Sequence, residues 1–484
     1  MEILFVSSEV APWSKTGGLA DVAGALSRAL AARGHAVTVV SPRYGAIDAR
    51  AQGFERTDNA LRVRGEPAAV WVKAGRPEVV LVEHERFFGA RHGLYGEGGH
   101  DFGDNAERFA FLTRAALALP AAMGRRIRIV HANDWQTGLA PFLLRHEHAQ
   151  DPALAGARSV FTIHNLAYQG LFPRQGVPFL GLPLDVLHPE VMGHHDQLSF
   201  MKAGLTFAEA LTTVSPTYAK EILTPEGGAG LEGVLRQRRA DLHGILNGID
   251  VAEWDPARDR HLPAHYSSRD LSGKATCKAE LQRELGLPER PQVPLVGMVS
   301  RLVDQKGIDL VMAALPELLE REVQVAVLGT GSRAYEDAFR RVAAERPDRL
   351  AARITFDEAL AHRIEAGADL FLMPSRYEPC GLNQMYSLRY GTAPVVRQAG
   401  GLEDTVEDFD GWQRGTGFKF RDYSPHALML AVRRALDAFR DRRAWRALLL
   451  RGMAQDFSWD RSARSYETLY GNLASGERSG WGAR

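Results

Sequence analysis

Residues 373–390 (MPSRYEPCGLNQMYSLRY) contain residue types that can bind a sugar and a phosphate together. The apolar run at 368–373 is typical of a buried parallel strand, and the residues after Gly381 are helix-like. Glu378, Cys380 and Gly381 would therefore lie where a strand passes into a helix. The N–H groups at such a helix start favour an anion, and a carboxylate one turn earlier can hold hydroxyls of the same ligand. The pattern predicts a sugar-phosphate site, unless the prolines and glycines only shape a tight connection that Glu378 caps.

A second candidate segment, Lys15-Thr16-Gly17-Gly18-Leu19, lies between a strand-like run at 3–6 and a helical pattern that ends at Gly34. The glycines admit close approach of a diphosphate, and Lys15 supplies positive charge. The segment is neither G-x-G-x-x-G nor a P-loop, so the nicotinamide and ATP fingerprints are absent here. The alternative is a glycine-rich turn with a solvated lysine. Asp21, on the first turn of the helix, either caps it or binds a ligand hydroxyl.

Polar clusters end two further apolar runs, at 131–135 (HANDW) and 162–165 (TIHN). The carboxyl ends of parallel strands line the ligand crevice of an α/β sheet, so these residues are expected there. Asp134, His164 and Asn165 are the candidates. A lone histidine at such a position is more often structural, and both interpretations of His164 remain open.

Two cations flank the first turn of a second series of strands, at Arg301 and Lys306, next to Gly307. Both could face phosphates, with ordinary surface charge as the alternative. Nearer the N-terminus, Tyr95 and the segment 101–111 are expected either to form a long loop over the cleft or to be plain exposed structure.

Strand-like and helical patterns alternate through both halves of the 484-residue chain, which is too long for one ordinary core. This rhythm predicts an α/β protein with two doubly wound, Rossmann-like parallel sheets facing each other across a cleft. A turn signal at 247–250 and an aperiodic stretch at 251–271 mark the boundary. The predicted domains are 1–250 and 251–456. Segment 457–484 is expected to contain a helix that crosses back to the first domain.

Composition narrows the function classes. Lys plus Arg equals Asp plus Glu, at 59 each, so no global field attracts nucleic acid or an acidic membrane. The two cysteines, Cys277 and Cys380, have no zinc-ligand spacing and offer no disulfide framework. No apolar run approaches the ~20 residues that span a bilayer, and the chain starts with a strand rather than a signal peptide. A soluble, cytoplasmic protein is expected.

The motifs together resemble bacterial glycogen synthases and plant starch synthases, in order and spacing along nearly the whole chain. They are the KTGGL loop, the HANDW and TIHN clusters, the turn 247–250, the Arg301/Lys306 pair and the 378–382 segment. The resemblance implies the GT-B arrangement of two Rossmann-like domains. It also implies transfer of glucose from ADP-glucose to the non-reducing 4-hydroxyl of an α-1,4-glucan such as glycogen, with retention of configuration and with no cofactor or essential metal.

Roles follow from the resemblance, motif by motif. The implied catalytic residues are Lys15, Asp134, His164, Arg301, Lys306, Glu378 and Cys380. The implied substrate-binding residues are Lys15, Gly17, Gly18, Asp21, Tyr95, Asn165, Asn247, Phe356, Gly381 and Leu382. Arg301 and Lys306 would neutralise the departing diphosphate in place of a metal. Glu378 would position glucose hydroxyls rather than act as a nucleophile, because retaining GT-B enzymes are thought to use front-face attack. Cys380 is either an activated thiol or a packed side chain.

Two departures and two rivals accompany this interpretation. Tyr386 stands where many retaining relatives have a second glutamate, a lack that the synthase subfamily shares. Phe356 stands where a tyrosine is expected, which keeps stacking on adenine but loses a hydroxyl. The nearest rival is a related transferase that uses UDP-glucose. The other rival is a binding protein that kept the fold but lost the catalytic residues, although the four residues whose loss would mark it are all present here: Lys15, Arg301, Lys306 and Glu378.

Overall fold

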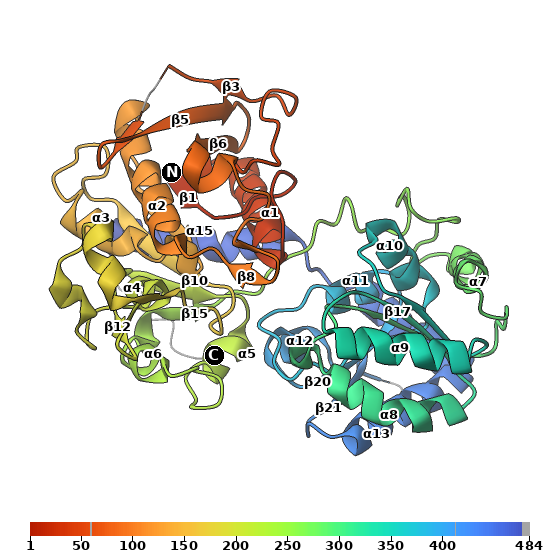
Figure 1. The fold of residues 1–484 in the computed structure, drawn as a ribbon. Helices are drawn as coiled ribbons and strands as arrows, with labels where there is room; N and C mark the ends of the chain where they lie inside the picture. The colour runs from red at the N-terminus through yellow and green to blue at the C-terminus, as the bar shows by residue number, and fades with distance from the viewer. Residues whose placement is uncertain (59–60, 412, 477–484) are drawn as a thin grey trace. The chain divides into compact units, whose positions relative to one another are not determined.

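The computed structural model describes residues 1–58, 61–411 and 413–476. The chain divides into two compact units (Figure 1). One contains Met1–Gly248 and the segment that begins at Trp459, and the other is Ile249–Ser458. The division falls next to residue 250, where the turn signal marks a boundary in the sequence. Of the predicted C-terminal segment, residues 477–484 lie outside the described residues.

The first unit is built on a ten-stranded sheet in the order β15-β14-β10-β9-β1-β2-β6-β5-β3, with β4 paired to β5. Its strands are β1 (Glu2–Val6), β2 (Ala36–Pro42), β3 (Glu55–Arg56), β4 (Leu61–Val63), β5 (Glu66–Lys73), β6 (Glu78–Glu83), β9 (Ile129–Asn133), β10 (Arg158–Ile163), β14 (Ala210–Thr213) and β15 (Leu242–Gly244). From β15 to β6 every pairing is parallel, but β5 runs antiparallel to β6. The prediction of a wholly parallel sheet is therefore wrong at this edge, because residues 74–77 are too few for the crossover that parallel pairing needs.

The chain reverses its direction of travel across this sheet between β1 and β9. From β1 it moves outward through β2 to β6, and from β9 it moves the other way through β10, β14 and β15. In open α/β sheets, ligands bind outside the carboxyl ends of the strands at such a switch point. The loops after β1, β9 and β10 therefore form the expected ligand crevice of this unit.

The helices and small elements of the first unit surround this sheet. The helices are α1 (Gly18–Ala32), α2 (Asn105–Ala122), α3 (Ala140–His146), α4 (Phe200–Phe207), α5 (Pro216–Glu221), α6 (Glu232–Gln237) and α15 (Trp459–Ser475). Single turns are η1 (Glu85–Gly89), η2 (Trp135–Thr137), η3 (Arg174–Leu180), η4 (Leu184–Leu187) and η5 (Arg239–Asp241). Strands β7 (Gly96–Glu97) and β8 (His100–Asp101) form a two-stranded antiparallel sheet. Strands β11 (Leu171–Pro173), β13 (Gln197–Ser199) and β12 (Gly193–His194) form a three-stranded antiparallel sheet in that order.

The segment 101–111 is not a long loop over the crevice. Helix α2 begins at Asn105, and its Phe109 and Phe111 are buried. Arg108, also fully buried, donates to the carbonyl oxygens of Phe87 and Leu94 and so holds the helix start against the preceding turn. Burial of these two aromatic side chains stabilises the segment as a helix. The polar residues at its start make this helix hard to predict from the sequence.

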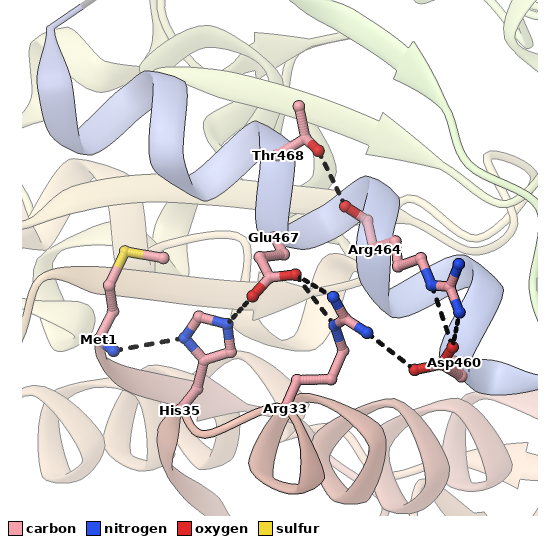
Figure 2. A network of polar contacts seen from close by, with 7 residues as sticks. All are labelled: Met1, Arg33, His35, Asp460, Arg464, Glu467 and Thr468. Atoms are coloured by element: carbon pink, nitrogen blue, oxygen red, sulfur yellow. Dashed lines mark hydrogen bonds and ion pairs between the residues drawn. The ribbon is translucent and has the colours of Figure 1, made fainter.

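Helix α15 packs on α1 within the first unit (Figure 2). The Arg33 guanidinium, at the end of α1, contacts the carboxylates of Asp460 and Glu467, and Glu467 also lies 3.1 Å from Nε2 of His35. The buried residues of α15 include Trp459, Tyr466, Leu469 and Tyr470. This face of the helix is therefore part of the core.

The second unit is built on a six-stranded sheet, in the order β18-β17-β16-β19-β20-β21, in which every pairing is parallel. The strands are β16 (Leu295–Val299), β17 (Gln324–Leu328), β18 (Leu350–Arg353), β19 (Leu370–Met373), β20 (Ala393–Arg397) and β21 (Phe418–Phe420). Its switch point lies between β16 and β19. Strand β18 ends at Arg353, so Phe356 lies in the loop after it.

Helices cover both faces of this second sheet. They are α7 (Ser272–Leu285), α8 (Ile308–Glu320), α9 (Arg333–Glu345), α10 (Glu358–Gly367), α11 (Asn383–Arg389), α12 (Gly400–Thr405), α13 (Pro425–Arg440) and α14 (Arg442–Met453), with a turn η6 (Asp304–Lys306). Alternate residues of each strand enter different cores: Leu370 and Leu372 pack with α8 and α13, whereas Phe371 and Met373 pack with α7 and α10. Strands buried on both faces read as continuous apolar runs. Within the described residues, no helix is long and apolar enough to cross a membrane.

Candidate active site

A buried carboxylate, Glu9, organises the glycine-containing loop after β1. Both the backbone N–H and the hydroxyl of Thr16 donate to it, the hydroxyl at 2.7 Å. Lys15 is thereby held at the start of α1, where its Nζ lies 2.8 Å from the Asp21 carboxylate. Both partners of that pair are partly exposed, so it contributes little stability. Glu9 was missed in the sequence, although a carboxylate just past an apolar strand is the signal that identified Asp134.

Tyr95 contacts the same carboxylate rather than forming part of a lid. Its hydroxyl donates to Glu9, and the Ser8 hydroxyl lies 2.8 Å from the same phenolic oxygen. Burial and the neighbouring Glu9 charge raise the pKa of Tyr95 well above its usual value. In this structure Tyr95 therefore positions Glu9.

Asp134 follows β9 and has a backbone conformation that is rare for a side-chain-bearing residue, with φ 59°. Strained backbone of this kind costs roughly 1–3 kcal/mol and is concentrated at functional sites. The carboxylate is buried and accepts the backbone N–H of His164 at 3.2 Å. Burial raises the pKa of Asp134 to about 7, although hydrogen bonds from the backbones of His164 and Asn165 oppose that rise.

His164 is half-buried beside Asp134, and its tautomer follows from its neighbour. Its Nε2 lies 3.0 Å from Oδ1 of Asn133, whose Nδ2 donates to the carbonyl oxygen of Val6. Because the Asn133 amide is oriented by that donation, its Oδ1 accepts a hydrogen bond from Nε2–H of His164. Burial lowers the pKa of His164 to about 3, so the ring is neutral at physiological pH. Asn165 stands next to it, and its Oδ1 accepts the N–H of Ala167.

His131 does not reach the crevice, contrary to what the HANDW cluster suggests. It is fully buried, with Nδ1 at 2.7 Å from the Tyr470 hydroxyl and Nε2 at 2.6 Å from the Thr162 hydroxyl. Successive side chains of a strand point to opposite faces, so only some residues of a polar cluster can face a ligand. His131 belongs to the contact between β9 and α15.

The raised pKa of Asp134 predicts a specific pH dependence of stability. Folding disfavours the ionised form of this carboxyl group. The contribution of the protonated group to stability is therefore full below the unfolded pKa near 4 and is lost as the pH rises through the folded pKa of about 7. Between pH 5 and 8 we expect the free energy of unfolding of the wild type to fall by about 2–3 kcal/mol relative to Asp134→Asn. Urea denaturation of both proteins at the two pH values measures this. A difference that does not change with pH would contradict the assignment.

Asn247 lies near the carboxyl ends of β14 and β15, and its side chain is 6% exposed. Its N–H donates to the carbonyl oxygen of Val214, but its buried Oδ1 has no hydrogen-bond partner among the described residues. An unsatisfied buried amide oxygen in a native protein calls for an explanation. A ligand group that donates a hydrogen bond supplies one.

The switch point of the second sheet brings Lys306 and Glu378 together. Lys306 follows β16 and Glu378 follows β19, and the Lys306 Nζ lies 2.6 Å from Glu378 Oε2. The Ser375 hydroxyl donates to the same oxygen at 3.0 Å, and Glu378 is 5% exposed. The loop after β16 can approach because Gly307 has no side chain: a Cβ there would lie 2.1 Å from the carbonyl oxygen of Pro374.

Further glycines pack the 378–382 segment against the loop after β20. A Cβ on Gly400 would lie 2.0 Å from the carbonyl oxygen of Glu378, and one on Gly401 would lie 2.1 Å from that of Cys380. Gly381 has φ 72°, and Leu382 is the N-cap of α11. Cys380 is buried. Glu378 does not cap α11, because its carboxylate is turned toward Lys306.

Two predicted residues of this unit are exposed. Arg301 donates to the Gln305 side chain at 3.1 Å, at the start of the loop that carries Lys306. Phe356 follows β18 and is 85% exposed, which leaves both ring faces available for stacking. In each unit, most predicted residues therefore follow the strands that flank the switch point. The exceptions are His164 and Asn165, which follow β10 next to β9, Tyr95, which acts through Glu9, and Asn247 and Phe356, which follow more distant strands.

Comparison with known proteins agrees with this geometry. Residues 2–237 match the family described as "Starch synthase catalytic domain", and residues 279–447 match "Glycosyl transferases group 1". The chain is 73% identical over 475 residues to a glycogen synthase of Anaeromyxobacter sp. (strain Fw109-5), covering 98% of this chain and all of the relative. It is 50% identical over 482 residues to a glycogen synthase of Myxococcus xanthus (strain DK1622), again covering 98% of this chain and all of the relative.

Among solved structures, the catalytic domain of starch synthase IV from Arabidopsis thaliana, bound to ADP and acarbose, has a TM-score of 0.90 and 35% identity, covering 98% of this chain and 99% of that one. Sucrose-phosphate synthase of Thermosynechococcus elongatus, at 18% identity and a TM-score of 0.62 over 98% of this chain and all of that one, shares the fold. The two α/β units and these matches define a glycosyltransferase of the GT-B class. Within that class, the chain belongs to the family of bacterial glycogen synthases and plant starch synthases.

Proposed function

We propose that this enzyme transfers glucose from ADP-glucose to the non-reducing 4-hydroxyl of an α-1,4-glucan, with retention of configuration and without an essential metal. The family membership and the Arabidopsis relative, whose structure is bound to ADP and acarbose, support this donor and acceptor. The same proposal includes a cytoplasmic location. Its mechanistic part rests on one observation, the contact between Lys306 and Glu378 at the switch point of the second sheet.

That contact places a cation and a carboxylate side by side. A nucleotide sugar needs both, because its diphosphate is negatively charged and its sugar hydroxyls donate hydrogen bonds. Departure of ADP places growing negative charge on the diphosphate, and a preorganised ammonium stabilises that charge more in the transition state than in the ground state. In our proposal Lys306, with Arg301, takes this role. Glu378 then holds hydroxyls of the glucose, because a carboxylate accepts hydrogen bonds from sugar hydroxyls while its second neighbour, Ser375, keeps it oriented.

Phe356 and the glycine-rich segment complete the donor site in this proposal. The exposed Phe356 ring offers a face for adenine, and the backbone N–H groups of Gly381 and Leu382 add to the phosphate contacts. The buried Cys380 packs beneath them rather than reacting. Retention follows from front-face attack, in which the acceptor oxygen enters on the side from which ADP leaves and its proton passes to the phosphate oxygen.

The residues of the first unit act on the sugar and the acceptor. In this proposal, His164 and Asp134 offer hydrogen-bonding groups near the reacting carbon. Neither carries a positive charge, which would oppose an oxocarbenium-like sugar. Lys15 and the amides of Gly17 and Gly18 contact the donor, with Asp21 and Asn165 placed beside them. The buried Oδ1 of Asn247 accepts a hydrogen bond from a hydroxyl of the glucose or the ribose.

The test is release of ADP from ADP-glucose with and without glycogen, in EDTA, with UDP-glucose in parallel. We expect glycogen-dependent ADP release that survives chelation, with UDP-glucose a much poorer donor. Loss of turnover in EDTA would overturn the metal-free mechanism. A preference for UDP-glucose would keep the mechanism and replace the donor, and no release from either donor would leave only a binding function.

A further inference from the structure

Three side chains of the second unit, none of them among the predicted site residues, bring metal-ligating atoms together. A carboxylate oxygen of Glu253, a carboxylate oxygen of Glu358 and a ring nitrogen of His362 lie within 4.8 Å of one another. Glu358 and His362 are four residues apart on α10, so they share one face of that helix. Glu253 lies in the turn at the start of the unit. Both glutamates are exposed, whereas His362 is 1% exposed.

The hydrogen bonding of His362 favours a cation ligand over a simple core histidine. Its Nδ1 lies 2.7 Å from Oδ2 of Asp259. The carboxylate fixes the proton on Nδ1 and leaves a lone pair on Nε2. That Nε2 is buried and has no hydrogen-bond partner among the described residues. A metal-ligating histidine usually donates its other N–H to a carboxylate in this manner. The arrangement therefore contains both a ligand and its orienting partner.

The imidazole is held rigidly in this orientation. The Trp254 ring stacks on it with centroids 3.7 Å apart and planes 14° apart. Asp259 is itself held in place, because it also accepts the Tyr390 hydroxyl at 2.6 Å. Preorganised ligands of this kind lose little freedom when a metal binds.

Two arginines of this unit, Arg363 and Arg389, contact other acceptors. Arg363, next to His362 on α10, makes a two-pronged contact with Glu284 at 2.7 Å. Arg389 donates to the backbone carbonyl oxygens of Val251 and Trp254. Both cations therefore have anionic or carbonyl acceptors of their own. None of the ion pairs described for this unit includes Glu358, whose carboxylate lies within 4.8 Å of a ring nitrogen of His362.

We propose that Nε2 of His362 and the carboxylates of Glu253 and Glu358 bind a divalent transition-metal cation, with Zn²⁺ the best fit. One imidazole and two carboxylates are ligands that zinc accepts, with water in the remaining position. A hard cation such as Mg²⁺ would instead take oxygen ligands only. The bound ion ties the turn that begins the second unit to α10. It stabilises this unit and takes no part in glucosyl transfer, so the proposal is independent of the proposed function.

The test is calorimetric titration of chelator-treated protein with Zn²⁺. We expect one tight equivalent in the wild type, and at least a tenfold weaker affinity in Glu253→Gln and in Glu358→Gln. Glu320→Gln, an exposed glutamate on α8 outside the cluster, is the matched control and should bind like the wild type. The substituted side chains are on the surface, so folding is retained, and His362 itself need not be changed.

Fluorescence supplies a second readout at the same site. Because Trp254 stacks on His362, Cu²⁺ or Co²⁺ bound at Nε2 should quench its emission, and Trp254→Phe should remove that component. Zn²⁺ should also raise the Tm of the wild type but not of Glu358→Gln. Equal Zn²⁺ affinity in the wild type and both glutamine variants would overturn the proposal, as would weak binding of several equivalents that no variant alters. Turnover in EDTA should stay unchanged throughout, which separates this test from that of the proposed function.

Discussion

Lys306→Ala is expected to lower kcat for ADP release by about a hundred- to a thousandfold, the scale on which a preorganised transition-state charge contact acts. Lys306 contacts Glu378 at 2.6 Å and would lie at the leaving diphosphate. KM for glycogen should change little, since the acceptor is bound through other residues. Steady-state ADP release at varied donor and glycogen concentrations measures both parameters. Equal turnover with and without the lysine would remove its role at the leaving group.

Removing Lys306 also leaves Glu378 buried without its partner, so stability must be separated from catalysis. The double variant Lys306→Ala/Glu378→Gln removes that uncompensated charge and should recover stability without recovering kcat. Lys278→Ala is the matched control, because Lys278 makes a comparable 2.6 Å contact with Asp369 at the opposite end of β19. It should lower the free energy of unfolding while leaving kcat of the folded enzyme close to wild type.

Gly307→Ala is expected to affect both stability and turnover. Gly307 has φ 72°, which costs a non-glycine residue roughly 1–2 kcal/mol, and the added Cβ would lie 2.1 Å from the carbonyl oxygen of Pro374. The loop must shift away from β19, and Lys306 shifts with it. We expect the free energy of unfolding to fall by more than the strain alone, with kcat lowered at least tenfold. Urea denaturation and the ADP-release assay on one preparation measure the two effects.

Gly286→Ala supplies the control for backbone strain. Gly286 ends α7 with φ 77°, but a Cβ there would meet no atom within 4 Å in the described part of the chain. It should lose about 1–2 kcal/mol from strain and keep its kcat. If Gly307→Ala behaved like Gly286→Ala in both assays, the close approach to Pro374 would have no catalytic consequence.

The core of the second unit was readable from the sequence because its strands are buried on both faces. The runs 325–328 and 370–373 are continuously apolar, and the structure has β17 and β19 there within one residue. Helix α8 begins at Ile308, next to the glycine that the pattern marks. In the first unit the same reasoning missed the hairpin between β5 and β6 and the start of α2, where a short turn and two buried phenylalanines decided the outcome.

The site was predictable only as a set of loop positions. Polar residues past the carboxyl ends of apolar runs include Lys15, Asp134, His164, Lys306 and Glu378. The structure has four of them after strands that flank a switch point, and His164 after β10, the neighbour of β9. The same rule, applied evenly, would have found Glu9. It could not have told that His131 points into the core, because the face of a strand that a residue occupies depends on register.

By itself, the sequence determined the alternation of strands and helices, the two units and the loops that carry the chemistry, since these depend on local periodicity and on where polar residues interrupt it. Only the tertiary structure decided which side chains touch. The Lys306–Glu378 contact joins residues 72 positions apart, and the Asp259–His362 contact joins residues 103 apart. Burial likewise raises the pKa of Asp134 to about 7 and lowers that of His164 to about 3. Such contacts and pKa shifts depend on which surfaces are removed from water, and packing between distant segments decides that.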